Sequence, residues 1–172
     1  MKVIAIAAVD RNGLIGKDSE LPWNIPEDMK FFKDATREQI VIMGRKTYDS
    51  LGKALPKREN AVITRDLKWH ASDARVFNDL LSAIQYFKGN LALQDKTIFI
   101  IGGAEIYSLS VPYLDEIWLT EIDAEFEGNV YFPFYRNGCL ELASFTRVSS
   151  RPQSDLHEGS VRYVFSTYLK KS

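Results

Sequence analysis

The sequence predicts an α/β domain with a largely parallel central sheet. Short continuous apolar runs, typical of strands buried on both faces, alternate with segments of helical periodicity. After residue 120 the segments become longer and partly alternating, which predicts a β-hairpin that closes one edge of the sheet. The length of 172 residues suits a single domain over 1–172, and we find no internal repeat or linker.

The elements follow in order along the chain. Apolar runs predict strands at residues 3–9, 40–43, 61–64 and 97–101, and the pattern changes after the run 117–120. Spacing of three and four residues predicts helices at 26–35, 46–51, 78–87 and 104–109. The predicted hairpin consists of residues 140–148 and 161–169, joined by the polar stretch 149–159.

The apolar run 3–9 follows Lys2 and loosely resembles a signal peptide, but it has the minimum length for one and stops at Asp10. A buried first strand explains it better. No stretch approaches transmembrane length, so we expect a cytoplasmic protein without a membrane partner.

Composition excludes several classes of function. The net charge of −1 gives no electrostatic reason to bind nucleic acid. The single cysteine, Cys139, allows no internal disulfide. His70 and His157 lie far apart in polar surroundings and have no metal-ligand spacing, so we expect no metal site.

One carboxylate falls on an apolar helix stripe. Pro26 suits the first helical position, and Asp28, Phe31, Phe32 and Ala35 then follow at i, i+3, i+4 and i+7. A carboxylate beside aromatic rings has either a raised pKa or a cationic partner, and both are common at functional sites. An acid that simply favours the positive helix end is the alternative interpretation.

A long connection, residues 10–25, leads directly to this helix. It contains Gly13, Gly16 and Pro22, with Leu21 and Trp23 among polar residues. Long connections without secondary structure are usually lids or binding loops, although an ordinary surface loop is the alternative.

Two strands run into glycine and then into a helix. The first junction is Gly44-Arg45-Lys46-Thr47 and the second is Gly102-Gly103-Ala104-Glu105-Ile106. Glycine lets a phosphate approach the backbone, so the pair could hold a pyrophosphate, whereas each glycine alone could simply make a turn. Thr64-Arg65 ends another strand, and Arg45 with Arg65 could bind a ribose 2′-phosphate. Asp66 opposes this assignment, and a solvated Arg65 is the alternative.

Together these segments resemble dihydrofolate reductase. The motifs that carry the resemblance occur in family order from Val3 to about Phe165: residues 21–23 with Pro26 and Asp28, 41–47, 55–56 with 58–60, 101–103 with 106–107, 119–122, and 132–133. The resemblance implies a mixed, mostly parallel eight-stranded sheet flanked by helices. It implies NADPH as cofactor, 7,8-dihydrofolate as substrate and antifolates as inhibitors, and we expect a monomer.

The resemblance also implies roles for individual residues. Asp28, supported by Thr120, would bind the pterin 2-amino group and N3. The substrate would further contact the carbonyls of Ile6 and Ile101, the side chains of Phe32 and Leu51, and, at its glutamate tail, Arg58. The cofactor would contact Ala8, Ile15, Gly44, Arg45, Lys46, Thr47, Thr64, Arg65, Gly102, Gly103, Ala104, Glu105 and Ile106. The Gly102–Gly103 peptide would be cis.

The implied chemistry is hydride transfer from nicotinamide C4 to pterin C6 with protonation of N5. Asp28 would anchor the pterin and raise the basicity of N5, while water admitted past Leu21 donates the proton. Tyr107 would place its hydroxyl dipole near the nicotinamide. Leu21 and Trp23 would belong to the mobile active-site loop.

Some positions depart from well-known bacterial members. Asn129 stands where an acid often holds the loop closed, and Lys53 replaces a frequent arginine near the glutamate tail. Two other functions remain open: a related-fold pyrimidine reductase of flavin synthesis, which Trp23, Asp28 and Arg58 oppose, and a non-catalytic NADP- or folate-binding module. NADPH consumption with and without dihydrofolate separates all three.

Overall fold

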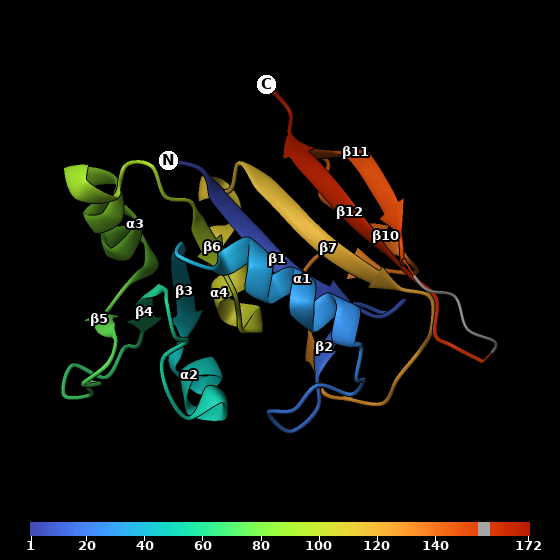
Figure 1. Cartoon of the computed structure of the whole chain (residues 1–172), viewed down its shortest axis with the longest axis horizontal. Coiled ribbons are helices and arrows are strands. Elements are labelled where there is room, and N and C mark those ends of the chain that lie inside the picture. The colour runs from blue at the N-terminus through green and yellow to red at the C-terminus, as the bar shows by residue number, and fades with distance from the viewer. Residues whose placement is uncertain (155–158) are drawn as a thin grey trace.

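An eight-stranded sheet forms the centre of the protein in a computed structural model that describes residues 1–154 and 159–172 (Figure 1). The strand order is β11-β12-β7-β1-β6-β3-β4-β5. These strands are β1 (Val3–Val9), β3 (Ile40–Gly44), β4 (Glu59–Ile63), β5 (Arg75–Phe77), β6 (Ile98–Ile100), β7 (Glu116–Ile122), β11 (Phe145–Pro152) and β12 (Tyr163–Lys170). All pairs from β7 to β5 are parallel, and β12 is antiparallel to both of its neighbours. The predicted fold class is confirmed.

Helices cover both faces of the sheet, which explains why its central strands are apolar on both sides. The helices are α1 (Pro26–Thr36), α2 (Arg45–Leu51), α3 (Leu80–Gly89) and α4 (Ala104–Ser110), with short 3₁₀ turns η1 (Leu91–Leu93) and η2 (Val111–Tyr113). Figure 1 shows α1 lying across the front of the sheet. Phe31 and Phe32 pack against a buried cluster that includes Ile4 and Ile6 of β1. Buried side chains of α3 and α4 pack in the core on the opposite face with Val3 and other strand residues. Within the described residues, no helix has the length and apolar character needed to cross a membrane.

The predicted hairpin is present, but its first strand was misplaced. Residues 139–140 form a separate short strand, β10 (Cys139–Leu140), which pairs with β9 (Tyr135–Arg136). The edge strand β11 begins only at Phe145, and residues 149–152, predicted as loop, belong to it. Seven of its eight residues are at least partly exposed, because an edge strand needs little apolar surface. A bulge between Arg147 and Ser149 further disturbs the alternation. The stretch 155–158, including His157, lies outside the described residues.

The connection 10–25 is not structureless throughout. It contains β2 (Leu14–Gly16), which pairs with β8 (Val130–Tyr131). Asp10 is fully buried, and its carboxylate accepts backbone N–H bonds from Asn12, Leu14 and Phe126 at 2.8–2.9 Å. These bonds fix the start of the connection beside the carboxyl end of β1. Strands of two or three residues, such as β2, β5 and β8, are too short to show a periodic pattern, so sequence analysis missed them.

Candidate active site

The first turn of α1 places Asp28 against β7. The hydroxyl of Thr120 donates to Asp28 Oδ1 at 2.5 Å. Burial raises the pKa of Asp28, and the hydrogen bond from Thr120 only partly opposes this rise. Of the two outcomes expected for a carboxylate on the apolar stripe, the structure therefore has the raised pKa. The carboxylate of the adjacent Glu27 instead accepts hydrogen bonds from Ser154 and Tyr163.

Aromatic side chains surround this turn of α1. The Phe31 ring lies 4.8 Å from the ring of Phe165 and 6.1 Å from that of Trp118, measured between centroids. Phe32 is half-buried and packs against the core on the α1 face of the sheet. Leu51, at the end of α2, is 42% exposed, so it has apolar surface free to contact a ligand.

The two carbonyls predicted to contact the substrate belong to Ile6, in the middle of β1, and to Ile101, directly after β6. The buried hydroxyl of Tyr107 donates to the carbonyl of Ile6 at 2.8 Å. Burial raises the pKa of Tyr107 further above neutral pH, at which a tyrosine hydroxyl with its ordinary pKa of 10.0 is already protonated. Ile101 directly follows β6, and its N–H donates to Ile42 of β3. Ala8 lies opposite Thr120 in the β1–β7 register, and Ile15 is the middle residue of β2.

The two glycine junctions meet, because β3 and β6 are neighbouring parallel strands. The N–H of Gly44 donates to the carbonyl of Gly102 at 2.8 Å. The Gly102–Gly103 peptide is cis, as the family resemblance implies, and Gly102 has a φ of 118° that favours glycine. A Cβ at position 44 would lie 3.0 Å from Cγ1 of Ile106. The remaining predicted cofactor contacts of these junctions lie in the first turns of α2 (Lys46 and Thr47) and α4 (Ala104, Glu105 and Ile106).

Both arginines of the predicted phosphate corner have carboxylate partners. Arg45 lies 3.5 Å from Asp49 and 3.4 Å from Asp66, and Arg65 lies 3.1 Å from Glu105. Thr64 directly follows β4, and its Oγ1 accepts the N–H of Asp66. The two arginines therefore follow neighbouring parallel strands at one edge of the sheet, where Arg45 is paired with two acids and Arg65 with one.

Arg58 is held between α1 and the segment before β4. Its guanidinium donates to Thr36 Oγ1 at 3.0 Å and to the carbonyls of Pro56 at 2.6 Å and Lys33 at 3.1 Å. Burial and the nearby Arg37 lower the pKa of Arg58. A guanidinium has five N–H groups, so about two remain for a ligand once these three bonds are made.

The connection 10–25 lies against the site. Trp23 is buried, with its ring 5.4 Å from that of Phe126, whereas Leu21 is 54% exposed. The indole N–H of Trp23 is buried and makes no hydrogen bond within the described part of the chain. Asn129 accepts from the N–H of Asp18 at 3.2 Å and donates to its carboxylate at 3.1 Å.

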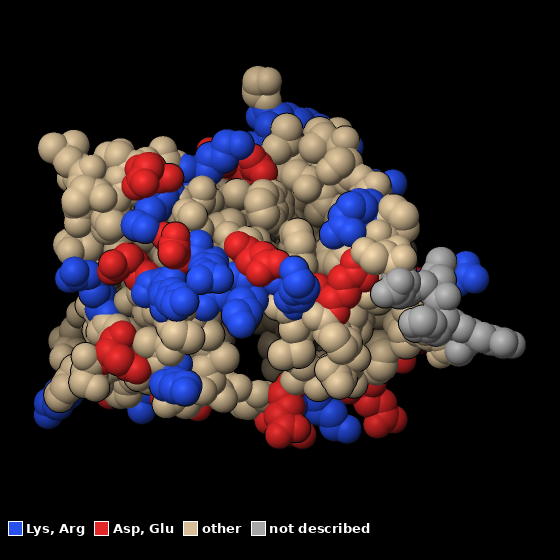
Figure 2. Space-filling model, in the orientation of Figure 1, with Lys and Arg blue, Asp and Glu red and all other residues tan. Residues whose placement is uncertain are grey.

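Figure 2 shows a hollow beneath α1, between the part of the molecule that contains α2 and the part that contains β2. Ser50 of α2 donates to the carbonyl of Ser19 at 2.5 Å, which joins α2 to the connection 10–25. On the same face, Lys and Arg side chains gather above the hollow, with Asp and Glu side chains at the margins of this group (Figure 2).

Some residues at the site carried no recognisable signal in the sequence. Trp69 lies beneath Arg45, with the guanidinium carbon 5.3 Å from the ring centroid. Glu105 was expected only as a cofactor contact, and its pairing with Arg65 was not foreseen. No local signal identifies such partners, because they come from loops and helices that follow different strands.

Comparison with known proteins agrees with this geometry. A family profile described as dihydrofolate reductase matches residues 2–170. The chain is 38% identical to a dihydrofolate reductase of Enterococcus faecium, with 98% of this chain and 97% of the relative covered. It is 36% identical to the dihydrofolate reductase of Bacillus subtilis, with 97% and 94% covered.

A solved structure gives the same picture. Dihydrofolate reductase from Enterococcus faecalis, complexed with NADP(H) and RAB-propyl, superposes with a TM-score of 0.86 at 27% identity, covering 99% of this chain and 97% of that one. These matches confirm the resemblance inferred from the sequence motifs. The chain belongs to the dihydrofolate reductase family, whose members are NADPH-dependent oxidoreductases.

Proposed function

We propose that this protein reduces 7,8-dihydrofolate to 5,6,7,8-tetrahydrofolate with NADPH, and thereby supplies one-carbon metabolism. The observation that carries the proposal is the half-buried Asp28 carboxylate, held by Thr120 beside the aromatic stripe of α1. Because burial disfavours the charged form of this carboxylate, a ligand that donates hydrogen bonds to it stabilises that form strongly. The 2-amino group and N3 of a pterin form such a pair of donors.

The other substrate contacts follow from this anchor. Phe32 and Leu51 would hold the pterin and aminobenzoyl rings, and the carbonyls of Ile6 and Ile101 would face the pterin and nicotinamide end. Arg58 would bind the α-carboxylate of the glutamate tail with its remaining N–H groups. Its three internal bonds support this role, because they fix the guanidinium before the ligand arrives. Antifolates that present the same donors as the pterin would occupy the same site.

The residues present fit NADPH. The two glycine junctions adjoin each other, and α2 and α4 begin directly after them, which supports a pyrophosphate site between them. Gly44 and Gly102 themselves are packed closely against Ile106 and Tyr107. Residues 44–47 and 102–106 would hold the pyrophosphate and adenosine ribose, with Ala8 and Ile15 toward the nicotinamide. Thr64, Arg65 and Arg45 would hold the 2′-phosphate. The indole N–H of Trp23, which is buried and has no hydrogen-bond partner among the described residues, also supports a ligand or water in this cleft.

Each part of the chain then has a task in the reaction. Bound NADPH supplies the hydride that pterin C6 accepts. The connection 10–25 covers the cleft and excludes bulk water. Asp28 fixes the pterin and favours protonation at N5, and the exposed Leu21 controls the entry of the water that gives this proton. The neutral hydroxyl of Tyr107 keeps its dipole beside the carbonyl of Ile6, near the reacting rings.

A direct test follows NADPH oxidation by absorbance with purified protein. We expect NADPH to be consumed only when dihydrofolate is present, and tetrahydrofolate to form in equal amount. A pyrimidine reductase would instead consume NADPH with the ribosylamino-pyrimidine of flavin synthesis. Binding of both ligands without turnover would show a non-catalytic module and overturn the proposal.

A further inference from the structure

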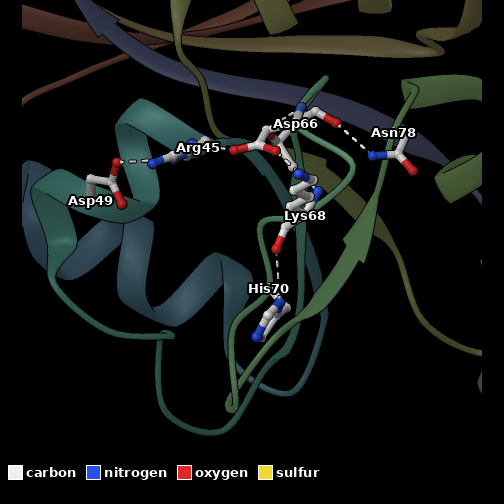
Figure 3. Close-up of polar contacts among 7 residues, drawn as sticks. Arg45, Asp49, Asp66, Lys68, His70 and Asn78 are labelled. Carbon is white, nitrogen blue, oxygen red and sulfur yellow. Dashed lines mark hydrogen bonds and ion pairs between the residues drawn. The ribbon is translucent and has the colours of Figure 1, made fainter.

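The guanidinium of Arg45 lies between two carboxylates, Asp49 on α2 and Asp66 on the loop after β4 (Figure 3). Both acids are about half exposed, with 55% and 50% of their side-chain surface accessible. Exposed ion pairs are weak and screened by salt, so a stronger anion can displace either acid. Arg45 is thus already partly neutralised at the corner proposed to receive a phosphate.

Topology brings these groups together. β3 and β4 are neighbouring parallel strands, so their carboxyl ends lie at one edge of the sheet. Arg45 follows β3, and Asp66 comes three residues after the end of β4. The pairing of β3 with β4 therefore fixes the backbone of Asp66 close to that of Arg45.

Local bonds hold the Asp66 carboxylate in place. Its Oδ1 accepts the N–H of Lys68 at 3.0 Å, and its own N–H donates to Thr64 Oγ1 at 3.2 Å. Asn78 donates to the carbonyl of Thr64 at 2.9 Å, which ties the same turn to the segment after β5 (Figure 3). Stacking on Trp69 fixes Arg45 from the other side. Asp66 is consequently a preorganised acid beside Arg45.

We propose that Asp66 is a specificity-determining residue that lowers the preference of this protein for NADPH over NADH. The proposal rests on the proposed cofactor site. A 2′-phosphate must displace Asp66 from Arg45 or lie beside its negative charge, whereas a free 2′-hydroxyl can donate a hydrogen bond to it. An acid near the ribose is the feature that favours the non-phosphorylated cofactor in dinucleotide sites.

The test measures dissociation constants of NADP⁺ and NAD⁺ by titration calorimetry, so it does not require turnover. Asp66→Asn keeps an oxygen that can accept from Lys68 and removes only the charge. We expect about two- to fivefold tighter NADP⁺ binding, the range for one exposed charge interaction, with NAD⁺ unchanged or weaker. Asp66→Glu retains the charge and should keep a selectivity closer to that of the parent protein.

Asp34→Asn is the matched control, because it removes the same charge from an exposed site on α1, where Asp34 pairs with Lys30. It should change neither constant. An unchanged NADP⁺/NAD⁺ ratio in Asp66→Asn, or equal tightening of both cofactors, would overturn the inference. If the parent protein bound neither NADP⁺ nor NADPH, the proposed function itself would fail, which is a different result.

Discussion

Thr120 and Asp28 join the first turn of α1 to β7 through a hydrogen bond of 2.5 Å between hydroxyl and carboxylate. The two residues are separated by 92 positions, and Asp28 is an acid whose pKa burial has raised. The Thr120 hydroxyl is the group that favours the charged form of this acid. It therefore controls both the charge and the orientation of the proposed substrate anchor.

Thr120→Val should raise the pKa of Asp28 further, because burial then acts without the opposing hydrogen bond. ¹³C NMR of the labelled carboxyl measures this shift directly. We also expect kcat/KM for dihydrofolate to fall about tenfold or more, the value of a hydrogen bond to a charged group. Thr167→Val, on neighbouring β12, is the control and should leave the carboxyl titration as it was. A downward shift in Thr120→Val would contradict the assigned role.

Asp28→Asn should stabilise the ligand-free protein at neutral pH. A carboxyl whose folded pKa is raised binds its proton more tightly in the folded state, so it destabilises the fold once the pH exceeds its ordinary value of 3.8. The penalty grows as the pH rises through the raised pKa and is complete above it. We expect a gain of about 0.5–2 kcal/mol in the unfolding free energy at pH 7, and less near pH 4, from urea titrations. If Asp28→Asn gained the same unfolding free energy over the parent protein at both pH values, the result would count against a raised pKa of Asp28.

Much of the fold was predictable because buried parallel strands carry their own signal. The continuous apolar runs at 3–9 and 40–43 identify strands covered by helices on both faces, and the structure confirms both. The stripe of α1 likewise predicted that Asp28 lies among aromatic rings. Edge strand β11 lacked such a signal, because it is mostly exposed and polar.

The parts of the site that could not be predicted depend on which strands become neighbours. Arg45, Asp66 and Glu105 each follow a different strand, and nothing local to any of them identifies its partner. The same holds for Asn129, whose partner Asp18 lies 111 residues away. Family resemblance supplied roles for several of these positions, but it did not supply the acids that pair with the arginines.

Arg58→Lys should raise KM for dihydrofolate about tenfold and change kcat little, because a carboxylate far from the reacting atoms contributes uniform binding. Lysine keeps the charge but loses the planar group that donates to Thr36, Pro56 and Lys33. Steady-state kinetics with 7,8-dihydropteroate, which lacks the glutamate tail, provides the control. A similar loss with that substrate would show that Arg58 only supports the structure.

Asn129→Asp should loosen the loop that contains Asp18. The amide of Asn129 donates to the Asp18 carboxylate, and an acid at this position would place two negative charges together. We expect hydride transfer to slow severalfold, seen as a larger primary deuterium isotope effect with deuterated NADPH, and to recover partly at high salt. Asn129→Ala removes both bonds without repulsion and should show no such salt dependence. Identical behaviour of the two variants would exclude the charge effect.

The central claim is that the Asp28 carboxylate anchors and activates the pterin, and the pH dependence of Asp28→Asn turnover tests it most directly. We expect NADPH binding to persist while dihydrofolate turnover at neutral pH falls by roughly two or more decades, since the lost charge interaction is worth several kcal/mol. The deficit should shrink at lower pH, because substrate already protonated in solution needs less help from the carboxylate. Near-normal turnover at neutral pH would remove Asp28 from the mechanism.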